Sequence, residues 1–381
     1  MLHKHAHKKT FNYAIIGAGA GGLTLAHRLS EDQDCTVTLF DPAFDRQNHI
    51  WGFWDKGETY LDMARKLSGG SWSKWEINHK SGTAVLQGRK YVYRALRSKD
   101  YETALLRDLK LRQNVMFQVT KVLEVVAEEE QRKLFLSNGL NLTFDAVFNT
   151  TPGKPSTPLF EQPLLQHFLG WQVSFEEPCF DATSIRLMDF RVSQDQGIHF
   201  MYLLPFSPTE ALVESTVLSN RPLVENWYEG QLSDYLAKRF DADYKVRSTE
   251  RGIIPMSKLT ANWRNTAIGV GMGGGALRAS SGYAFAQTLG QIDRLVASMR
   301  GRLSQPVVPA AADMTERWMD DVFLRVLNDC PKAAPGIFYA MGKKLEGDQF
   351  AGFMRGHAPW RTRLKLIGAV PKLPFLQKAL G

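Results

Sequence analysis

The chain has 381 residues, of which 44% are hydrophobic and 23% charged, so it is long enough for a large core or two linked domains. Its cysteines, Cys35, Cys179 and Cys330, are far apart without a CxxC pair, which argues against a disulfide framework or zinc site and favours the cytoplasm. Three of the 47 basic residues lie in the first nine positions and six after Asp348, leaving 38 against 39 acids in the body, so a basic nucleic-acid-binding face is not expected.

The first predicted elements form a dinucleotide-binding pattern. Apolar runs predict a strand at Asn12–Ile16, a helix at Leu23–Leu29 and a second strand at Val37–Phe40. The first turn has the pattern G-x-G-x-x-G, and an acid follows the second strand. Such glycines let the backbone approach a pyrophosphate at the helix N-terminus, and the acid accepts hydrogen bonds from a ribose. The predicted dinucleotide-binding residues are Gly17, Gly19, Gly22 and Asp41.

The rest of the chain favours FAD over NAD. A simple dehydrogenase would continue with alternating strands and helices, whereas this chain continues through a Trp- and Gly-rich region and several short strands, with a helix at Asp100–Lys110. A second glycine-rich loop returns late, between a predicted strand at Thr266–Val270 and a helix from about Ser281. In FAD-binding proteins, two glycine-lined segments that are far apart in the sequence hold the pyrophosphate and the ribitol of the cofactor. The residues of this loop expected to bind FAD are Gly271, Gly273, Gly274 and Gly282.

These elements predict an α/β fold: a Rossmann-like FAD-binding domain with an inserted β-rich substrate domain and a helical C-terminal part. The FAD-binding domain would comprise residues 11–156 and 255–312. The substrate domain would comprise residues 157–254, and the C-terminal region, with its basic tail, residues 313–381.

Two predicted strands of the substrate domain carry acids. In "LLPFSPTEALVEST", strand alternation places Glu214 on one face with Leu212 and Thr216, and Asp189 alternates with Leu187 in "RLMDFR". An acid that loses its hydration has a raised pKa and can donate a proton near neutrality. The residues alone leave a structural role open for both acids. Glu214 could face water or meet an arginine, and Asp189 could pair with Arg186 or Arg191.

In their order along the chain, the motifs resemble those of the flavin-dependent lycopene cyclases of carotenoid biosynthesis, of the bacterial lycopene beta-cyclase type. The resemblance runs from about Asn12 to Gly356 and follows the glycine turn through "NHIWGFW", "FLGWQVSF", "LMDFR", "LLPFSPTEALVEST", "ERGIIPM" and "GVGMGGGALRASSGY". The chain departs from the family at Ser215, where many members have a second acid, and at Met272, where flavoenzymes often have an aspartate.

The resemblance implies a redox-neutral cyclisation of the ψ-ends of linear carotenes such as lycopene. A proton is added to the terminal double bond, the neighbouring double bond attacks the resulting cation, and loss of a ring proton leaves a cyclic end group. It implies Glu214 and Asp189 as catalytic residues, reduced FAD acting without net electron transfer to the product, and NAD(P)H as the reductant. Trp51 is expected near the flavin. Aromatic faces for the substrate and its cation would come from Trp54, Trp171, Phe190, Tyr202, Phe206 and Tyr283, each of which could also be an ordinary core residue.

The tail "PWRTRLKLIGAVPKLPFLQKALG" mixes basic and apolar residues, as suits the surface of an anionic bilayer. Because the substrate is so apolar, we expect the protein to associate peripherally with the cytoplasmic face of a membrane. The alternative is that the tail is a solvated C-terminal extension. The sequence contains no run of eighteen apolar residues, so no membrane span is predicted.

The other functions open are a prenyl-chain reductase, a monooxygenase or halogenase, and a non-catalytic carotenoid- or flavin-binding protein. The ring type, the number of ends cyclised, the base that removes the final proton and the oligomeric state stay open.

Overall fold

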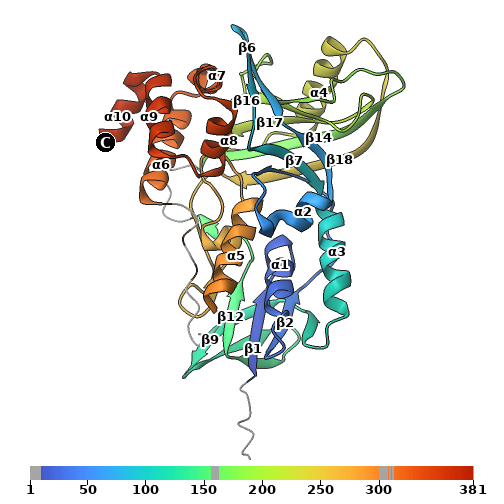
Figure 1. Ribbon diagram of the computed structural model, residues 1–381, viewed down its shortest axis with the longest axis vertical. Coiled ribbons are helices and arrows are strands. Elements are labelled where there is room, and N and C mark those ends of the chain that lie inside the picture. Colours follow the sequence, from blue (N-terminus) through green and yellow to red (C-terminus); the bar gives the residue numbers. More distant parts are fainter. Residues whose placement is uncertain (1–9, 156–162, 300–307, 309, 311–312, 381) are drawn as a thin grey trace, which may run out of the picture.

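The computed structural model describes residues 10–155, 163–299, 308, 310 and 313–380. The basic N-terminal residues and the domain boundary predicted at residue 157 lie outside these ranges. Figure 1 shows a parallel sheet with its helices at one end of the molecule, a larger sheet at the other, and the C-terminal helices beside the larger sheet.

A five-stranded parallel sheet carries the glycine-rich turn. Its strand order is β20-β12-β1-β2-β8, so the central strand β1 leads directly into the turn. The predicted strands and helix around the turn are confirmed. The bounds are β1 Phe11–Ile16, α1 Ala20–Leu29, β2 Cys35–Asp41, β8 Val115–Val119, β12 Ala146–Asn149 and β20 Ile268–Gly269.

Each face of this sheet is covered by a different layer. The side chains of β1 alternate between the two faces and so pack in two separate clusters. Tyr13 and Ile15 pack in one apolar cluster with α1, with α3 (Ser98–Lys110) and with α5 (Phe285–Met299). Ala14 and Ile16 pack in another with a three-stranded antiparallel sheet. That sheet consists of β9 Val122–Glu128, β10 Gln131–Leu136 and β11 Asn141–Phe144.

A small antiparallel sheet and short connecting elements join the two ends of the molecule. Its order is β3-β7-β4, and β3 contains the "IWGFWD" segment of the Trp-rich region. The bounds are β3 Ile50–Asp55, η1 Thr59–Leu61, α2 Asp62–Lys66, β4 Ser68–Trp72, β7 Val92–Arg97, β13 Lys154–Pro155, β19 Leu259–Thr260 and η2 Gly271–Gly274.

The larger sheet has seven strands in the order β18-β14-β17-β16-β15-β5-β6. Strands β5 and β6 come from the segment assigned by sequence to the FAD-binding domain, and β5 pairs in parallel with β15. The predicted division at residues 156 and 157 therefore does not separate the two sheets. The bounds are β5 Lys74–His79, β6 Gly82–Gln87, β14 Leu165–Phe175, β15 Ser184–Asp189, β16 Ile198–Pro205, β17 Glu210–Ser219 and β18 Tyr244–Pro255.

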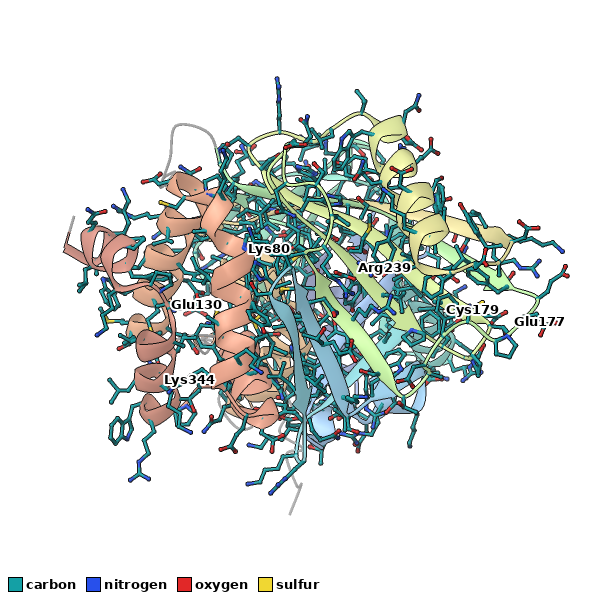
Figure 2. The ribbon with its side chains drawn as sticks, turned by 90° about the horizontal axis from the view of Figure 1, so that it is seen from above. Lys80, Glu130, Glu177, Cys179, Arg239 and Lys344 are labelled. Carbon is teal, nitrogen blue, oxygen red and sulfur yellow. The ribbon has the colours of Figure 1, made fainter. Side chains whose placement is uncertain are left out.

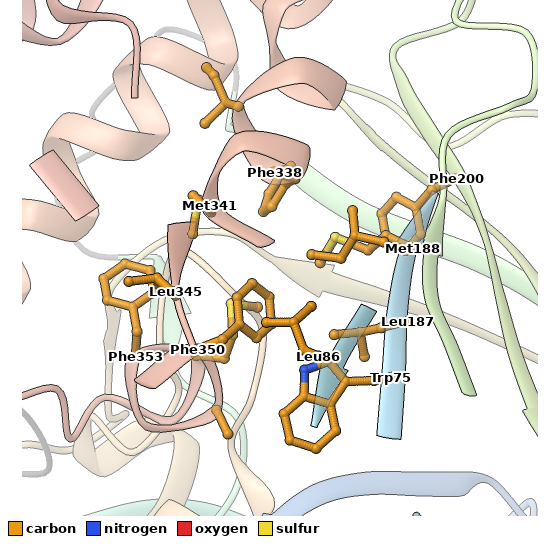
Figure 3. Close-up of a cluster of buried hydrophobic side chains, with 14 of the residues drawn as sticks. Trp75, Leu86, Leu187, Met188, Phe200, Phe338, Met341, Leu345, Phe350 and Phe353 are labelled. Carbon is orange, nitrogen blue, oxygen red and sulfur yellow. The ribbon is translucent and has the colours of Figure 1, made fainter. Parts of the chain in front are cut away.

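Helices lie on both sides of this sheet (Figure 2). Helix α4 (Glu225–Arg239) packs Leu232 and Leu236 against one face, in a cluster that includes Val213 of β17. C-terminal helices cover part of the other face, where Phe338 and Met341 approach the side chains of β5, β6, β15 and β16 (Figure 3). In β17, Val213 thus faces α4, and the next residue, Glu214, lies on the opposite face of the sheet.

The predicted C-terminal region is helical in the described residues, with its last helix ending at Leu380. Helix α6 starts at an N-cap, Asp313, whose side chain accepts a hydrogen bond from the backbone N–H of Glu316. A buried ion pair between Arg278 and Asp320 ties α6 to the loop before α5. Among the described helices, none is long and apolar enough to span a bilayer. The bounds are α6 Met314–Asp329, η3 Pro331–Ala333, α7 Ala334–Lys344, α8 Gly347–Arg355, α9 Trp360–Ala369 and α10 Lys372–Leu380.

Candidate active site

One cavity of about 470 Å³ extends from the glycine-rich turn after β1 to the face of the seven-stranded sheet. Gly17 and Gly19 line one end of it, Glu214 lines the other, and Trp51 lies on its wall with them. The strands of the parallel sheet that end at this cavity are β1 and β12, followed by Gly17 and by Thr150. The residues predicted to bind a cofactor and the principal predicted acid therefore share one space.

The glycine-rich turn leaves room for a ligand above the N-terminus of α1. Gly17 has φ +98°, a conformation that favours glycine, and Gly19 is the N-cap of α1. Gly22 does not line the cavity; a Cβ there would lie 1.8 Å from the carbonyl oxygen of Gly17, so this glycine allows the helix to pack on the turn.

Asp41 supports the turn from beneath. Its carboxylate accepts a hydrogen bond from the backbone N–H of Ala18 (2.7 Å) and pairs with the guanidinium of Arg46, a residue that lines the cavity. Asp41 is itself 4% exposed and is not among the lining residues, so its contact with a ribose stays a prediction. Sequence analysis missed Arg46.

The second glycine-rich loop reaches the same cavity through two of its four predicted residues. Gly271 and Gly282 line it, followed by Tyr283 and the start of α5. Gly273 and Gly274 do not line it; they allow close backbone packing, because a Cβ on Gly274 would lie 2.4 Å from the carbonyl oxygen of Gly269. We therefore assign these two glycines a structural role in place of direct cofactor contact.

Glu214 stands on β17 with its side chain in the cavity. It is 8% exposed and accepts a hydrogen bond from the Thr216 hydroxyl (2.5 Å). Burial raises the pKa of Glu214 to about 7, against the lowering effect of that hydrogen bond. A carboxyl of this kind is substantially protonated at neutral pH and can donate its proton to a bound ligand.

Three tyrosines meet beside Glu214. Tyr202 lies across the strand pair from Glu214, and its hydroxyl donates to that of Tyr93 at 2.6 Å. Tyr283 donates to the same oxygen at 3.2 Å. Burial raises the pKa of all three phenols well above the usual value, so they remain neutral. All three line the cavity; Tyr202 and Tyr283 were predicted, and Tyr93 was missed.

Asp189 lies outside the cavity, and the catalytic role predicted for it needs correction. Its side chain is 0% exposed and accepts two hydrogen bonds from Arg191, both at 2.8 Å, and one from Tyr235 of α4 at 2.9 Å. Burial alone would raise the pKa of Asp189, but the hydrogen bonds and charge of Arg191 outweigh it and lower the pKa. The carboxylate therefore stays ionised in a structural pair, one of the two readings left open by the sequence.

Four predicted substrate-binding aromatics are also absent from the cavity wall. Trp171 faces α4, in the cluster with Leu232. Trp54 packs between Trp75 and Tyr93, Phe190 stacks on Phe338 with ring centroids 5.7 Å apart, and Phe206 packs against Trp72. These positions correspond to the core role that the sequence left open. Trp51 does line the cavity, beside Phe285 of α5 at a centroid distance of 5.1 Å.

A second buried carboxyl in the cavity, Glu250, was not predicted. It is 4% exposed and accepts a hydrogen bond from the backbone N–H of Ile50 at 2.7 Å. Strand alternation in "ERGIIPM" places it on one face with Gly252 and Ile254, a pattern that could have identified it. Its neighbour Arg251 points to the opposite face and pairs with Glu225 on α4.

Comparison with known sequences identifies a family over nearly the whole chain. The family model described as "Lycopene cyclase protein" matches residues 12–379. A lycopene beta-cyclase of Pantoea ananas is 24% identical over 385 residues, covering 96% of both chains. A chloroplastic lycopene beta cyclase of an Oncidium hybrid cultivar is 27% identical over 308 residues, which cover 74% of this chain and 62% of the plant protein. The chain thus spans less than two thirds of that plant relative.

Comparison with solved structures places the fold among flavoproteins. A geranylgeranyl bacteriochlorophyll reductase-like protein of Thermoplasma acidophilum has a TM-score of 0.63 at 12% identity, covering 97% of this chain and 98% of that one. A variant of Klebsiella pneumoniae HpxO, solved with FAD, has a TM-score of 0.58 at 15% identity, covering 97% and 100%. The predicted fold class, a Rossmann-type α/β fold with a further β-rich part and C-terminal helices, is confirmed.

Proposed function

Since the chain belongs to the lycopene cyclase family, we propose that it catalyses the acid-initiated cyclisation of the ψ-ends of a linear carotene, lycopene, without net oxidation or reduction. The observation that carries this proposal is the shared cavity, in which a buried, protonatable Glu214 and a glycine-lined dinucleotide cradle open into one space.

The residues around the glycine-rich turn suit FAD. The cradle between Gly17, Gly19 and α1 is a space that side chains would fill, and Arg46 adds a cation beside it. Gly271, Gly282 and Trp51 would bind the distal part of the cofactor, nearer to Glu214. Bound in its reduced form, FAD would supply negative charge or acid–base chemistry next to a developing cation without passing electrons to the product. We propose NAD(P)H as the source of its electrons.

Glu214 would start the reaction by transferring its proton to the terminal double bond of the bound end group. Desolvation keeps the carboxyl protonated at neutral pH, so the proton is available when the alkene is bound beside it. The tertiary cation that results needs electron-rich surroundings that exclude water. Tyr202, Tyr283 and Trp51 line the cavity and would contribute roughly 0.5–2 kcal/mol each through their aromatic faces.

We further propose that the protein collects this apolar substrate from the cytoplasmic face of a membrane through α9. Trp360, Leu364 and Ile367, spaced four and three residues apart, are 65%, 57% and 53% exposed and form one apolar stripe. Arg361 and Lys365 are exposed beside it. The opposite face of α9 is anchored by buried Leu366 and Thr362. An exposed apolar stripe flanked by basic residues suits an anionic bilayer surface.

Replacing Trp360, Leu364 and Ile367 together by serine should abolish flotation with anionic liposomes, because it removes the inserted apolar area and leaves the buried face of α9 unchanged. A matched control is the double change Leu111→Ser and Val119→Ser, which removes apolar side chains that are 81% and 73% exposed near the parallel sheet. The control should float like the unmodified protein. Equal flotation of both variants would contradict the role of α9.

The cyclase function itself is tested by anaerobic incubation of the full chain with FAD, NADPH and lycopene in liposomes. Chromatography with mass detection should find a product of unchanged mass and blue-shifted absorption. A gain of hydrogen would indicate a prenyl-chain reductase, and a gain of oxygen a monooxygenase. Retention of flavin and carotene without conversion would indicate a binding protein.

A further inference from the structure

Glu214 and Glu250 lie on the same face of the large sheet, one on each side of β14. Antiparallel pairing places Gly170 of β14 opposite Glu214 of β17 and also opposite Glu250 of β18. A Cβ on Gly170 would lie 3.2 Å from Cγ of Glu250 and 3.6 Å from Cβ of Glu214. Because Gly170 has no side chain, nothing from β14 stands between the two acids, and both line the cavity.

The pair has the electrostatics of two carboxyls that hold one proton. Burial raises the pKa of Glu214 to about 7. Burial, followed by the charge of Glu214, raises the pKa of Glu250 to about 8. Within the described residues, no Lys or Arg is among the groups that shift either pKa. Near neutral pH, two such carboxyls do not both ionise, so one remains an acid while the other can act as a base.

Their hydrogen-bond partners distinguish the two members. Glu250 accepts from the backbone N–H of Ile50, which can only donate and therefore favours an ionised oxygen. Glu214 is bonded to the hydroxyl of Thr216, which can rotate and accept a hydrogen bond from a protonated carboxyl. Of the two, Glu214 has the lower pKa and is the stronger acid, whereas Glu250 has the higher pKa and is the stronger base; the Ile50 N–H stabilises Glu250 in the ionised form that accepts a proton.

The residue after Glu214 does not supply a second acid to the cavity. Ser215 is fully buried on the opposite face of β17, where its hydroxyl is 3.0 Å from Nε2 of His199. A carboxylate at position 215 would therefore point toward α4 and away from the cavity. Glu250 is the described residue that brings a second carboxyl to Glu214.

Resting on the cyclase function proposed above, we propose that Glu250 is the second proton-transfer residue of the reaction, the base that takes the ring proton. Glu214 loses its O–H proton as a C–H bond forms at the inner, CH carbon of the terminal alkene, which leaves a tertiary cation at the outer carbon. The neighbouring double bond then forms the ring C–C bond and leaves a ring cation. Glu250 takes a proton from the adjacent ring carbon, and the C–H electrons form the new double bond. Between turnovers Glu250 releases this proton to solvent and Glu214 takes up another, which restores the pair, and no electrons are gained or lost overall.

The test is turnover of lycopene in D₂O by the flavin-loaded full chain and by Glu250→Gln, Glu214→Gln and a surface control, Glu225→Gln. The wild type should form rings that carry one deuterium per cyclised end. Glu250→Gln should form rings about 100-fold more slowly, and its recovered acyclic carotene should carry deuterium, because protonation occurs and reverses when the ring proton is not removed. Glu214→Gln should give neither rings nor deuterium, and Glu225→Gln should match the wild type.

Two results with Glu250→Gln would overturn the proposal: ring formation within about threefold of the wild type, or loss of both rings and deuterium uptake, which would make Glu250 necessary for the first proton transfer. Flavin content and melting temperature report the integrity of the variant; glutamine keeps an oxygen to accept from Ile50. If Glu250→Gln does not fold, Glu250→Asp decides the matter by the same two readouts. Its shorter carboxylate should slow removal of the ring proton, so that cyclic product forms more slowly and deuterium appears in the recovered acyclic carotene. A wild type that forms no rings and takes up no deuterium would instead refute the underlying cyclase function.

Discussion

Glu214→Gln should lower the rate of cyclisation by at least about 100-fold while leaving flavin binding and folding intact. Glutamine has nearly the same volume and can still bond to Thr216, but it has no proton to donate to an alkene. The measurement is the initial rate of cyclic carotene formation with reduced flavin, at equal flavin occupancy. A variant that retains more than a tenth of the wild-type rate would contradict the assignment of Glu214 as the acid.

Glu210→Gln is the matched control, because Glu210 lies on the same strand and is exposed. It should leave the rate unchanged. The wild-type rate should also depend on pH: burial raises the pKa of Glu214 to about 7, and only the protonated form donates. The rate should therefore fall as the pH rises above about 7, and the Glu210→Gln variant should show the same profile.

The second large effect concerns the glycine-rich turn, where one alanine substitution should lower stability and another should weaken flavin binding. Gly22→Ala should destabilise the protein by about 1–3 kcal/mol or more, since its Cβ would lie 1.8 Å from the Gly17 carbonyl oxygen and backbone would have to move. A lower melting temperature of the flavin-free protein would show this. An unchanged melting temperature would mean that α1 does not pack on the turn as described.

Gly19→Ala should leave the fold intact and weaken flavin binding. Gly19 has φ −81°, which any residue adopts, and its Cβ would come no closer than 3.6 Å to another group, the Arg46 guanidinium. The added methyl would instead intrude on the cradle, and a cost of about 1–3 kcal/mol there corresponds to a loss of about fivefold to 160-fold in affinity. Titration of flavin into the flavin-free variant measures the effect; wild-type affinity would contradict the place proposed for the pyrophosphate.

Local spacing made part of the site predictable. The turn with Gly17 and Gly19 needs only a strand, a short loop and a helix in sequence, so its geometry is encoded within a few residues. The side of β17 that carries Glu214 followed from alternation along one regular strand. Asp189 shows where this reasoning fails: the register of β15 shifts between Arg186 and Asp189, so alternation from Leu187 does not give its direction.

Pairings between distant segments could not be read from the sequence. Trp171 and Gly170 are neighbours, and only the register with β17 decides that Gly170 faces the cavity and Trp171 faces α4. Glu250 enters the site because β18 pairs with β14, after an intervening helix and three strands. Strands β5 and β6 belong to the large sheet because β5 pairs in parallel with β15, about a hundred residues later in the chain. No local pattern indicates this pairing.

The mixed origin of the seven-stranded sheet constrains how substrate preference can be exchanged between relatives. A chimaera that transplanted only the continuous segment from β14 to β18 would separate β15 from its partner β5. It would also mismatch the Phe338 and Met341 side chains that pack on that side. The exchangeable unit is discontinuous: three pieces of the gene, encoding β5 and β6, β14 to β18, and α6 to α8, would have to be moved together.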